Sequence, residues 1–597
     1  MITPMRKVFV VARAADRDPL LAALRDLGAV HLAPVDPAKA VPDAETTATL
    51  DRMRRAVQVL AEVGPRGSAP DLSPAEAAEE VLRIQRESVE RAGRLSALHL
   101  QLGQLALWGD TRLEDFQALQ EAGVRVAFYA VPRKAVDQVQ ADCVQVLGPW
   151  PGRRTLVAVA ARTAVSVPQG AEVLPLPERD RPGIRAKAAE IDAALASDGQ
   201  RLAELAHLVP AMRKALPALR EKAAWTLAAR GALDDPHLAA VQGWAPAEKA
   251  DALAARLAEA GVHAAVQASE PAPGEEPPTL IRYNWFTRPM KGLFDILGTV
   301  PGYREFDVST VFMIFLPVFS AILISDTGYG LLYLLLPAVF YRRMEAAGAK
   351  ALAQLVMAIG ACSVIWGVLT CSLFGFGFAW VFGRTEPFIP VTMKKESMDL
   401  LMWISITLGA VQLSLAHLWK AKAAFPRLNF LSEAGWVTFL WGMYGVVKML
   451  LLKDPPKPAD LPAQTYYCEM LVIGGLLAIV FAVPHRNPLK MLGLGLANFP
   501  LSAIGTFGDT VSYIRLMAIG LAGSAIAMVF NQMAGKLPWY VAVLILLAAH
   551  GLNVALSIIS LFAHGVRLNM LEFSNNLGMQ WSGYAYEPFA KRHREET

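Results

Sequence analysis

Long apolar segments fill the chain after Asp307 and restrict what it can fold into. A transmembrane helix needs about 20 mostly apolar residues to cross the roughly 30 Å hydrocarbon core of a bilayer. Eight candidate spans are present, at about 308–325, 327–341, 351–375, 399–418, 434–452, 469–484, 508–533 and 538–566. With 54% hydrophobic residues over 597 positions, the chain is too apolar for a soluble protein of this length. The sequence therefore predicts an α-helical polytopic membrane domain over 307–597, preceded by a linker or interfacial segment over 282–306.

The first half of the chain, 1–281, has the pattern of a soluble α+β region. Short strand-like apolar runs occur near both of its ends and again in its middle. These segments are Arg6–Val11, Val30–Leu32, Val124–Val131, Thr155–Ala160, Val241–Pro246 and Val262–Gln267. Helices are expected over Asp18–Leu27 and Glu248–Glu259. We expect a proximal lobe from about 1–72 and 231–268, and a distal lobe from about 111–181.

Two helical segments, about 73–110 and 182–230, are expected to join the lobes as a coiled-coil hairpin. The first has a start signal at 73–76 (SPAE), which supplies an N-cap, a first-turn proline and a capping-box glutamate. Its narrow apolar seam is typical of a coiled coil and consists of Val81, Ile84, Leu95, Leu98, Leu102 and Leu105. The second is expected to be interrupted at Pro210 and Pro217. The half is thus predicted to be a cytoplasmic dumbbell, whose rod serves for reach and attachment.

Arg515 is the only charge in the apolar run from Thr510 to Phe530. An arginine at this depth costs at least about 2.5–3.5 kcal/mol on insertion scales. It stays protonated, because its pKa lies above about 12 in proteins. Such charges mark ion paths and counter-ions; the alternative is a structural ion pair, although we expect the carboxylate partner to lie outside this chain. Asp509 and Ser512 precede Arg515 at spacings of three and are expected near it.

A polar stripe follows on the last predicted span. It consists of His550, Asn553, Ser557, Ser560, His564 and Arg567. At 100° per residue these side chains share an arc of about 100° on one helix face. The stripe predicts a hydrophilic line that holds water against a neighbouring helix. The alternative is that its side chains only form hydrogen bonds that hold two helices together. Glu433 is a candidate for the entrance of an ion path or for a headgroup position. Glu572, about 140° from Arg567 on an α-helix, is expected only to cap or pair at the surface.

The sequence contains no motif for hydrolysis. The patterns GxxxxGK[ST], GxGxxG after a strand, HExxH and GxSxG are missing, so we expect no catalytic site on this chain. The four cysteines have no zinc or disulfide spacing, and we expect neither a metal nor a cofactor. A net charge of +4 implies no nucleic-acid partner. Energy for ion movement against a gradient would have to arrive from another protein.

Both termini are expected in the cytoplasm. The N-terminal segment has an apolar run of only about five residues, which is too short for a signal peptide. With that end inside, the inner loops and the tail hold more Lys and Arg than the outer loops do.

Five sequence motifs occur along the chain. They are Gln242–Pro246 (QGWAP), Phe315–Gly330 (FLPVFSAILISDTGYG), Ser512–Leu516 (SYIRL) with AIGLA after it, Ala563–Phe573 (AHGVRLNMLEF) and Gly583–Phe589 (GYAYEPF). Together they resemble subunit a, called subunit I in bacteria, of the V-type and archaeal-type rotary ATPases. The resemblance covers nearly the full length, and the two arginine helices are its strongest part. The family's critical arginine matches Arg515, and its second arginine matches Arg567.

The resemblance implies a non-catalytic membrane stator in the cell (inner or plasma) membrane. Its implied partners are a rotating ring of proteolipid subunits, peripheral-stalk subunits on the dumbbell, a central-rotor cap subunit and membrane lipid. A fixed cation favours the charged form of a passing ring carboxylate, which therefore releases its proton or sodium ion. Two offset aqueous half-channels then connect the ring to the two sides of the membrane.

Three positions depart from the family pattern. The family usually has a glycine before the aspartate of the DTGYG segment, where this chain has Ser325. Eukaryotic relatives carry a histidine where this chain has Gly523 and a glutamate where it has Ser557. Two other functions are also considered: a self-contained secondary transporter with a regulatory cytoplasmic domain, and a scaffold or sensor. The lack of an internal repeat in the membrane domain argues against the transporter, and the polar stripe argues against a plain anchor.

Overall fold

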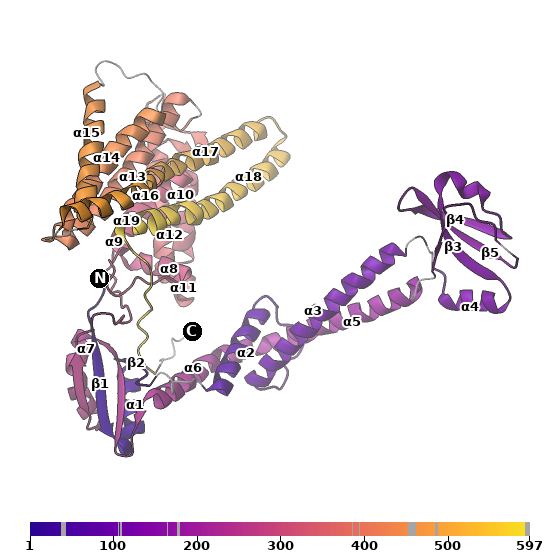
Figure 1. Cartoon of the computed structure of the whole chain (residues 1–597), viewed down its shortest axis with the longest axis horizontal. Helices are drawn as coiled ribbons and strands as arrows, with labels where there is room; N and C mark the ends of the chain where they lie inside the picture. The colour runs from indigo at the N-terminus through magenta and orange to yellow at the C-terminus, as the bar shows by residue number, and fades with distance from the viewer. Residues whose placement is uncertain are drawn as a thin grey trace.

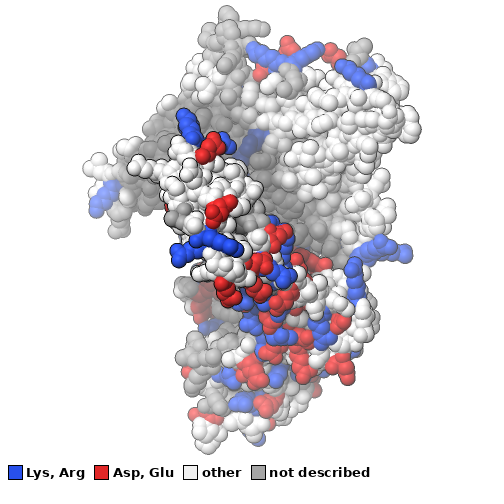
Figure 2. All heavy atoms as spheres, turned by 90° about the vertical axis from the view of Figure 1, so that its right-hand side faces the viewer, with Lys and Arg blue, Asp and Glu red and all other residues white. Residues whose placement is uncertain are grey.

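The computed structural model describes most of the chain, namely residues 1–36, 43–105, 107, 110–163, 165–175, 180–384, 386–392, 394–451, 461–483 and 487–591. One portion is an extended assembly of two small sheets joined by helices, and the other is a bundle of apolar helices (Figure 1). Figure 2 shows charged side chains spread over the extended portion, whereas the bundle presents a wide uncharged area with charges at its far edge. A surface that faces lipid needs such an uncharged band.

The proximal lobe is a five-stranded antiparallel sheet with two helices packed on it. Its strands are β1 (Met5–Arg13), β2 (His31–Ala33), β7 (Leu233–Asp234), β8 (Leu238–Pro246) and β9 (Ala265–Ser269), in the order β2-β8-β1-β9 with β7 beside β8. Its helices are α1 (Arg17–Leu27) and α7 (Ala247–Glu259), with a 3₁₀ turn at Ala14–Asp16. Alternate residues of β1, Val8 and Val10, pack against the buried leucines of both helices. Both helices and four of the strands lie where the sequence predicts them.

The distal lobe is a four-stranded antiparallel sheet in the order β4-β5-β3-β6. Its elements are α4 (Leu113–Glu121), β3 (Arg125–Pro132), a 3₁₀ turn (Arg133–Gln138), β4 (Cys143–Trp150), β5 (Arg154–Ala161) and β6 (Glu172–Leu174). The two central strands, β3 and β5, are those that the sequence predicts. The edge strands are not predicted, because β4 has no buried residue and β6 has only three residues. Neither therefore shows the apolar alternation by which a strand is found.

Helices from both directions of the chain form the rod. They are α3 (Pro74–Gln104), α5 (Arg181–Leu205), a 3₁₀ turn (Ala206–Leu208) and α6 (Val209–Gly231). The predicted capping box is confirmed: Glu76 N–H donates to Ser73 Oγ at 3.3 Å, and Ser73 N–H donates to Glu76 Oε2 at 3.0 Å. The predicted interruption at Pro217 is wrong, since Pro217 lies inside α6. Pro210 lies in the first turn of α6, where a missing N–H costs nothing.

An additional helix, α2 (Ala44–Leu60), thickens the rod near the proximal lobe. These residues are expected to belong to the proximal lobe, and no helix is predicted for them. Met53 and Ala56 of α2 pack into one cluster with Val81 of α3 and Met212 of α6. The rod is therefore a three-helix core at this end and a two-helix seam further out, where Leu98 packs on Ile184 and Ile191.

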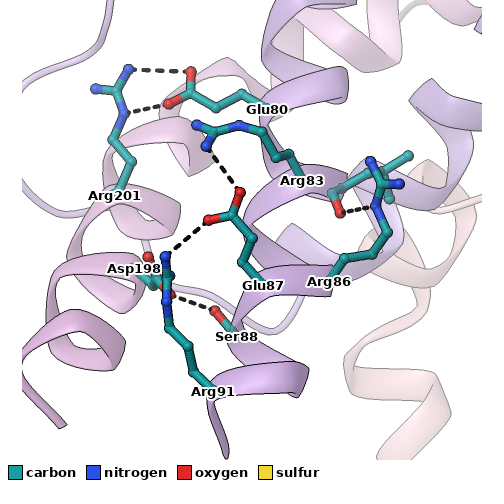
Figure 3. A network of polar contacts seen from close by, with 9 residues as sticks. Glu80, Arg83, Arg86, Glu87, Ser88, Arg91, Asp198 and Arg201 are labelled. Carbon is teal, nitrogen blue, oxygen red and sulfur yellow. Dashed lines mark hydrogen bonds and ion pairs between the residues drawn. The ribbon is translucent and has the colours of Figure 1, made fainter. Parts of the chain in front are cut away.

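A charged network fixes how α3 and α5 lie against each other (Figure 3). Arg201 of α5 donates to both carboxylate oxygens of Glu80 at 2.9 and 3.3 Å. Asp198 accepts a hydrogen bond from Ser88 at 2.9 Å and also pairs with Arg91. The bonds to Glu80 raise the pKa of Arg201. Exposed pairs of this kind contribute at most about 1 kcal/mol each, so the apolar seam supplies most of the association and the charges select the register.

The apolar bundle begins after α8 (Arg288–Leu297). Its elements are α9 (Ser309–Ile324), α10 (Thr327–Val339), α11 (Tyr341–Ala346), α12 (Lys350–Leu369), a short hairpin β10–β11 (Ser372–Leu373, Phe376–Gly377), a 3₁₀ turn (Ala379–Phe382), α13 (Lys395–Ala424), α14 (Asn429–Leu451), α15 (Leu461–Phe481), α16 (Pro488–Ser512), α17 (Ile514–Ala534), α18 (Trp539–Ser560), two π-helical turns (Leu561–Val566, Leu568–Phe573) and α19 (Ser574–Leu577).

Four helical stretches among the described residues are long and apolar enough to cross a membrane. Judged by length and composition, they are Lys350–Leu369, Lys395–Ala424, Pro488–Ala534 and Trp539–Leu577. Shorter apolar helices occupy Ser309–Ile324, Thr327–Val339 and Thr465–Phe481. The count of eight spans stays a prediction, and the predicted ends of the fifth and sixth spans, at 452 and 484, lie outside the described residues.

The seventh predicted span, 508–533, is not one uniform helix. A helix already begins at Pro488, and the 47-residue stretch to Ala534 is divided at Tyr513 into α16 and α17. Leu516 N–H bonds back to the Tyr513 carbonyl, three residues away, in a tightened turn. Arg515 consequently lies in the first turn of α17, near the middle of the stretch.

The C-terminal tail, residues 579–591, leaves the bundle and returns to the proximal lobe (Figure 1). Tyr586 N–H donates to the Thr279 carbonyl at 3.1 Å, and Phe589 N–H donates to the Val30 carbonyl at 2.8 Å. The sequence analysis includes these residues in the membrane domain, whereas the structure places them against β2.

Side chains of the tail complete the proximal lobe. Phe589 is 8% exposed and joins the lobe's core, with its ring centroid 6.1 Å from that of Trp225. Glu587 N–H donates to His31 Nδ1 at 3.1 Å. Burial lowers the pKa of His31, which keeps the ring neutral near pH 7 and leaves Nδ1 free to accept that bond. The tail thus ties the lobe to the bundle by backbone and side-chain contacts.

Candidate functional site

Arg515, Arg567 and Glu572 meet where the first turn of α17 faces the π-helical turns. Arg515 Nη2 lies 2.9 Å from Glu572 Oε1, and Arg567 Nε lies 3.6 Å from the same oxygen. Arg515 Nε also donates to the Ser512 carbonyl at 3.1 Å. The Glu572 side chain is 4% exposed, against 28% for Arg515 and 51% for Arg567. Two predicted arginines therefore converge on one buried carboxylate of the same chain.

Glu572 is the residue that the sequence analysis misplaces. The expectation of a surface role rests on α-helical geometry, in which residues five apart diverge by about 140°. The chain instead forms two π-helical turns, Leu561–Val566 and Leu568–Phe573. A π-helix bonds residue i to i+5, so residues five apart come closer to one side. Arg567 and Glu572 are brought together in this way, and the expectation that the carboxylate partner of Arg515 lies outside this chain is wrong for the isolated chain.

A buried chain of hydrogen bonds holds the backbone beside Arg515. Tyr513 is fully buried, and its hydroxyl donates to Gln412 Oε1 at 2.7 Å. Gln412 Nε2 donates to Asn569 Oδ1 at 2.9 Å, and Asn569 Nδ2 donates to the Gly565 carbonyl at 3.0 Å. The Tyr513 ring lies against Gly409, where a Cβ would come within 2.4 Å of it. This network links α13, the helix break and the π-turns, and it therefore fixes the position from which Arg515 projects.

Polar side chains lead from this centre towards the junction of α13 and α14. Asn576 Nδ2 bonds to Asp509 Oδ2 at 2.6 Å and to the Glu572 carbonyl at 2.7 Å. Glu433 Oε2 lies 2.8 Å from His417 Nδ1, and Glu433 Oε1 lies 3.0 Å from Lys420 Nζ. His417 is buried, with 5% of its surface exposed. Asp509 and Glu433 thus both lie in polar surroundings on one side of the arginine pair.

A second polar cluster lies at the other end of the stripe. Tyr329 Oη is 2.7 Å from His550 Nδ1, and Asn553 Nδ2 donates to Tyr329 Oη and to the Gly523 carbonyl, each at 3.0 Å. A Cβ at Gly523 would lie 3.5 Å from Asn553 Oδ1. The Asn553 amide therefore occupies the space beside Gly523.

Asp326 anchors the loop next to this cluster. Its carboxylate accepts from the N–H groups of Gly328, Phe374 and Gly375 at 2.7–2.9 Å and from Ser372 Oγ at 2.6 Å. The side chain is 2% exposed, and it caps the N-terminus of α10. Asp326 is thus a structural carboxylate that holds the β10–β11 hairpin onto α10.

The middle of the stripe joins the two polar regions. Ser557 is 8% exposed and donates to the Asn553 carbonyl at 2.8 Å. Ser560 and His564 are half-buried, and His564 Nδ1 has no hydrogen-bond partner in the described part of the chain. Ser512 contributes its carbonyl rather than its hydroxyl to Arg515. The α-helical register of the stripe ends at Ser560, because π-helical turns begin at Leu561.

The described residues contain no group of three or more His, Cys, Asp or Glu that could hold a metal ion. Four free cysteines are spread over the chain, at Cys143, Cys362, Cys371 and Cys468. The site offers a pair of fixed cations, a buried carboxylate and two groups of titratable or hydrogen-bonding side chains.

Comparison with known proteins relates this chain to a family. The model of the V-type ATPase 116 kDa subunit family matches residues 195–376. V-type ATP synthase subunit I 1 of Treponema pallidum is 29% identical over 648 aligned residues, which cover 99% of this chain and 100% of the relative. V-type ATP synthase subunit I of Borreliella burgdorferi is 27% identical over 629 residues, with coverage of 99% and 100%. The crystal structure of the cytoplasmic N-terminal domain of subunit I, homolog of subunit a, of V-ATPase matches 44% of this chain and all of that domain, with 17% identity and a TM-score of 0.19.

Proposed function

We propose that this chain, which belongs to the V-type ATPase 116 kDa subunit family, is the ion-conducting membrane stator of a rotary ATPase. In this role it carries no catalytic site and moves a proton or sodium ion past a ring of proteolipid subunits. The observation that carries the proposal is the arginine pair at a buried carboxylate, with a polar group of side chains on either side of it. A plain anchor has no use for such costly intramembrane charges.

The two polar groups are proposed to line the two half-channels. The group with Glu433, His417 and Asp509 lies next to the C-terminal end of α13, whose lysines are expected on the inner side. The group with Tyr329, His550 and Asn553 lies at the opposite end of the stripe and serves the outer side. Ser557, Ser560 and His564 continue from it towards Arg567. An ion that enters on one side reaches the ring near the arginines and has no direct route to the other side.

The arginines provide the electrostatic step. A ring carboxylate that arrives with its ion meets the permanent charge of Arg515, which favours the ionised carboxylate. The carboxylate releases its ion into the adjacent half-channel and passes the arginine as an ion pair. It takes up a new ion only after it reaches the second half-channel. Arg515 thereby drives the release and also separates the two aqueous routes.

The surface of α17 fits the close approach of a ring helix. Ala518 and Ala522 continue along α17 from Arg515 and are exposed. Small residues let a neighbouring helix come near and shorten the distance between opposite charges. The exposed Arg567 side chain and the half-buried Arg515 side chain are then within reach of a carboxylate on that helix.

The extended half is proposed to be the cytoplasmic arm of the stator. The lobes would bind peripheral-stalk subunits, and the rod sets the distance between them, while a central-rotor cap subunit and membrane lipid are further partners. The chain would lie in the cell membrane as a multi-pass protein with both termini inside. The tail joins the bundle to the proximal lobe, which supports the placement of both ends of the chain on the same side of the membrane.

Purification of the tagged chain in mild detergent tests the function. We expect a proteolipid ring and soluble ATPase subunits to co-purify in a fixed ratio with it. Ion transport by the purified chain alone in liposomes would instead indicate a secondary transporter. A monodisperse chain with neither partners nor transport would contradict both functions and favour a scaffold.

Replacing Asn553 and His564 together with leucine is expected to slow ATP-driven ion uptake about tenfold, the effect of an added barrier of roughly 1.4 kcal/mol. Both changes remove polar groups from the stripe without altering charge at Arg515. Initial uptake rates in reconstituted complexes provide the measurement. The control is Ile559→Leu on the same helix, since Ile559 is 62% exposed and lies outside the stripe. Unchanged uptake in the double variant would remove the stripe from the ion path.

A further inference from the structure

Glu572 combines deep burial with incomplete pairing. Its Oε1 atom is shared by Arg515 at 2.9 Å and Arg567 at 3.6 Å. Its Oε2 atom is buried and has no hydrogen-bond partner within the described residues. A carboxylate can accept about four hydrogen bonds, so this one has unused capacity although it is 4% exposed. Glu572 can therefore hold Arg515 while a second carboxylate competes for the same guanidinium group.

The contact distances differ between the two arginines. The 2.9 Å contact to Arg515 is a charge-assisted hydrogen bond, whereas the 3.6 Å contact to Arg567 is only electrostatic. A guanidinium has five N–H donors, and Arg515 uses one on Glu572 and one on the Ser512 carbonyl. Arg515 thus retains donors for a second carboxylate. If Arg515 turned away, Arg567 would need only a small movement to form a full hydrogen bond with Glu572.

We propose that Glu572 is a positioning residue, the resident counter-ion that holds Arg515 between successive ring carboxylates and transfers to Arg567 when one arrives. The inference rests on the proposed stator function. In the isolated chain Glu572 neutralises one of the two adjacent cations. When a ring carboxylate binds Arg515, Glu572 shifts towards Arg567, and each cation then has one carboxylate. When the ring advances, Glu572 returns and competes with the departing carboxylate for Arg515. The counter-ion therefore speeds release of the ring from the arginine.

The test uses the assembled complex and the variant Glu572→Gln, which keeps the shape and removes the charge. Without the competitor, Arg515 holds each ring carboxylate longer. We expect ATP-driven ion uptake to slow about tenfold, in line with the loss of one hydrogen bond to a charged group, while the number of ions moved per ATP stays unchanged. The double variant Glu572→Gln with Arg567→Gln removes one charge of each sign. It lacks the competitor for Arg515 as well, so its uptake is expected to be at least as slow as that of Glu572→Gln.

The outcomes separate this inference from the proposed function. Full uptake in Arg515→Ala would overturn the stator function itself. Loss of uptake in Arg515→Ala together with parental uptake in Glu572→Gln would overturn only the role of Glu572. A double variant with parental uptake, or a fall in ions moved per ATP in Glu572→Gln, would overturn the role of Glu572 as a competitor for Arg515. If Glu572→Gln does not assemble, the double variant is measured instead, and failure of both to assemble would likewise assign Glu572 to folding.

Discussion

Replacement of Arg515 by alanine is expected to abolish ATP-driven ion uptake. The substitution removes a permanent cation from the point where a ring carboxylate must give up its ion, and the carboxylate would then pass still occupied. Loss of one preorganised electrostatic partner typically costs about 100-fold or more in rate, which places uptake at the background level. The measurement is ATP-driven uptake into membrane vesicles, followed by an ion-sensitive dye. ATP hydrolysis, assayed in the same vesicles, shows whether the soluble subunits remain attached.

Two further variants make this result interpretable. Arg384→Ala removes an exposed arginine whose guanidinium lies 4.6 Å from the Phe388 ring on the α12–α13 connection, and it is expected to leave uptake unchanged. Arg515→Ala alone leaves Glu572 buried with a weaker partner, which can destabilise a protein by several kcal/mol. Arg515→Ala combined with Glu572→Gln removes both charges and should restore assembly without restoring uptake. Normal uptake in either assembled Arg515 variant would refute the proposed role of the arginine.

The sequence is sufficient for features that depend on local spacing. The capping box at Ser73 and Glu76 needs only two residues three apart, and it is present as predicted. The central strands of both lobes follow from apolar alternation. Arg515 is conspicuous in a sequence because a charge in a long apolar run is costly wherever the helix lies.

Features that depend on tertiary packing could not be predicted from the sequence. The π-helical turns that align Arg567 with Glu572 contain no residue that marks them, and an α-helical projection therefore misplaces Glu572. The bond between Gln412 and Asn569 joins positions 157 apart, so neither residue has a local pattern that points to the other. A buried charge needs a partner. The two π-turns could therefore be anticipated only by testing which helix geometry brings Glu572 to an arginine.

The position of the tail could not be predicted from local patterns either, because its motif Gly583–Phe589 (GYAYEPF) has no helical or strand periodicity. In the structure it runs beside the proximal lobe and inserts Phe589 into the core of that lobe. The tail connects the bundle to the proximal lobe. In the proposed stator, this connection would fix the arm to the part that faces the ring. The conformation of this motif is set by contacts with distant parts of the chain rather than by a regular secondary structure of its own.

Deletion of the tail from Gly583 onward is therefore expected to uncouple the complex. The truncated chain loses burial of Phe589, worth about 1.5–3 kcal/mol for a side chain of this class, and the backbone bonds to Thr279 and Val30. We expect the proximal lobe to be cleaved by protease at least about tenfold faster, which corresponds to a local loss of roughly 1.4 kcal/mol. We also expect ATP hydrolysis to continue while ions moved per ATP fall by half or more. A chain truncated after Lys591 is the matched control, since it keeps the tail contacts with Thr279, His31 and Val30.

A graded series shows whether the contacts or merely the length of the tail matter. Tyr586→Phe removes only the hydroxyl that donates to the Ala29 carbonyl at 2.7 Å, and it is expected to have a small effect. Phe589→Ala removes the buried ring and should reproduce most of the protease sensitivity of the deletion, because the ring is the largest apolar contribution of the tail to the lobe. Parental coupling in the deletion, with the lobe equally protected, would show that the membrane bundle and the arm transmit torque without the tail. Protection lost with coupling intact would limit the tail to stabilising the lobe.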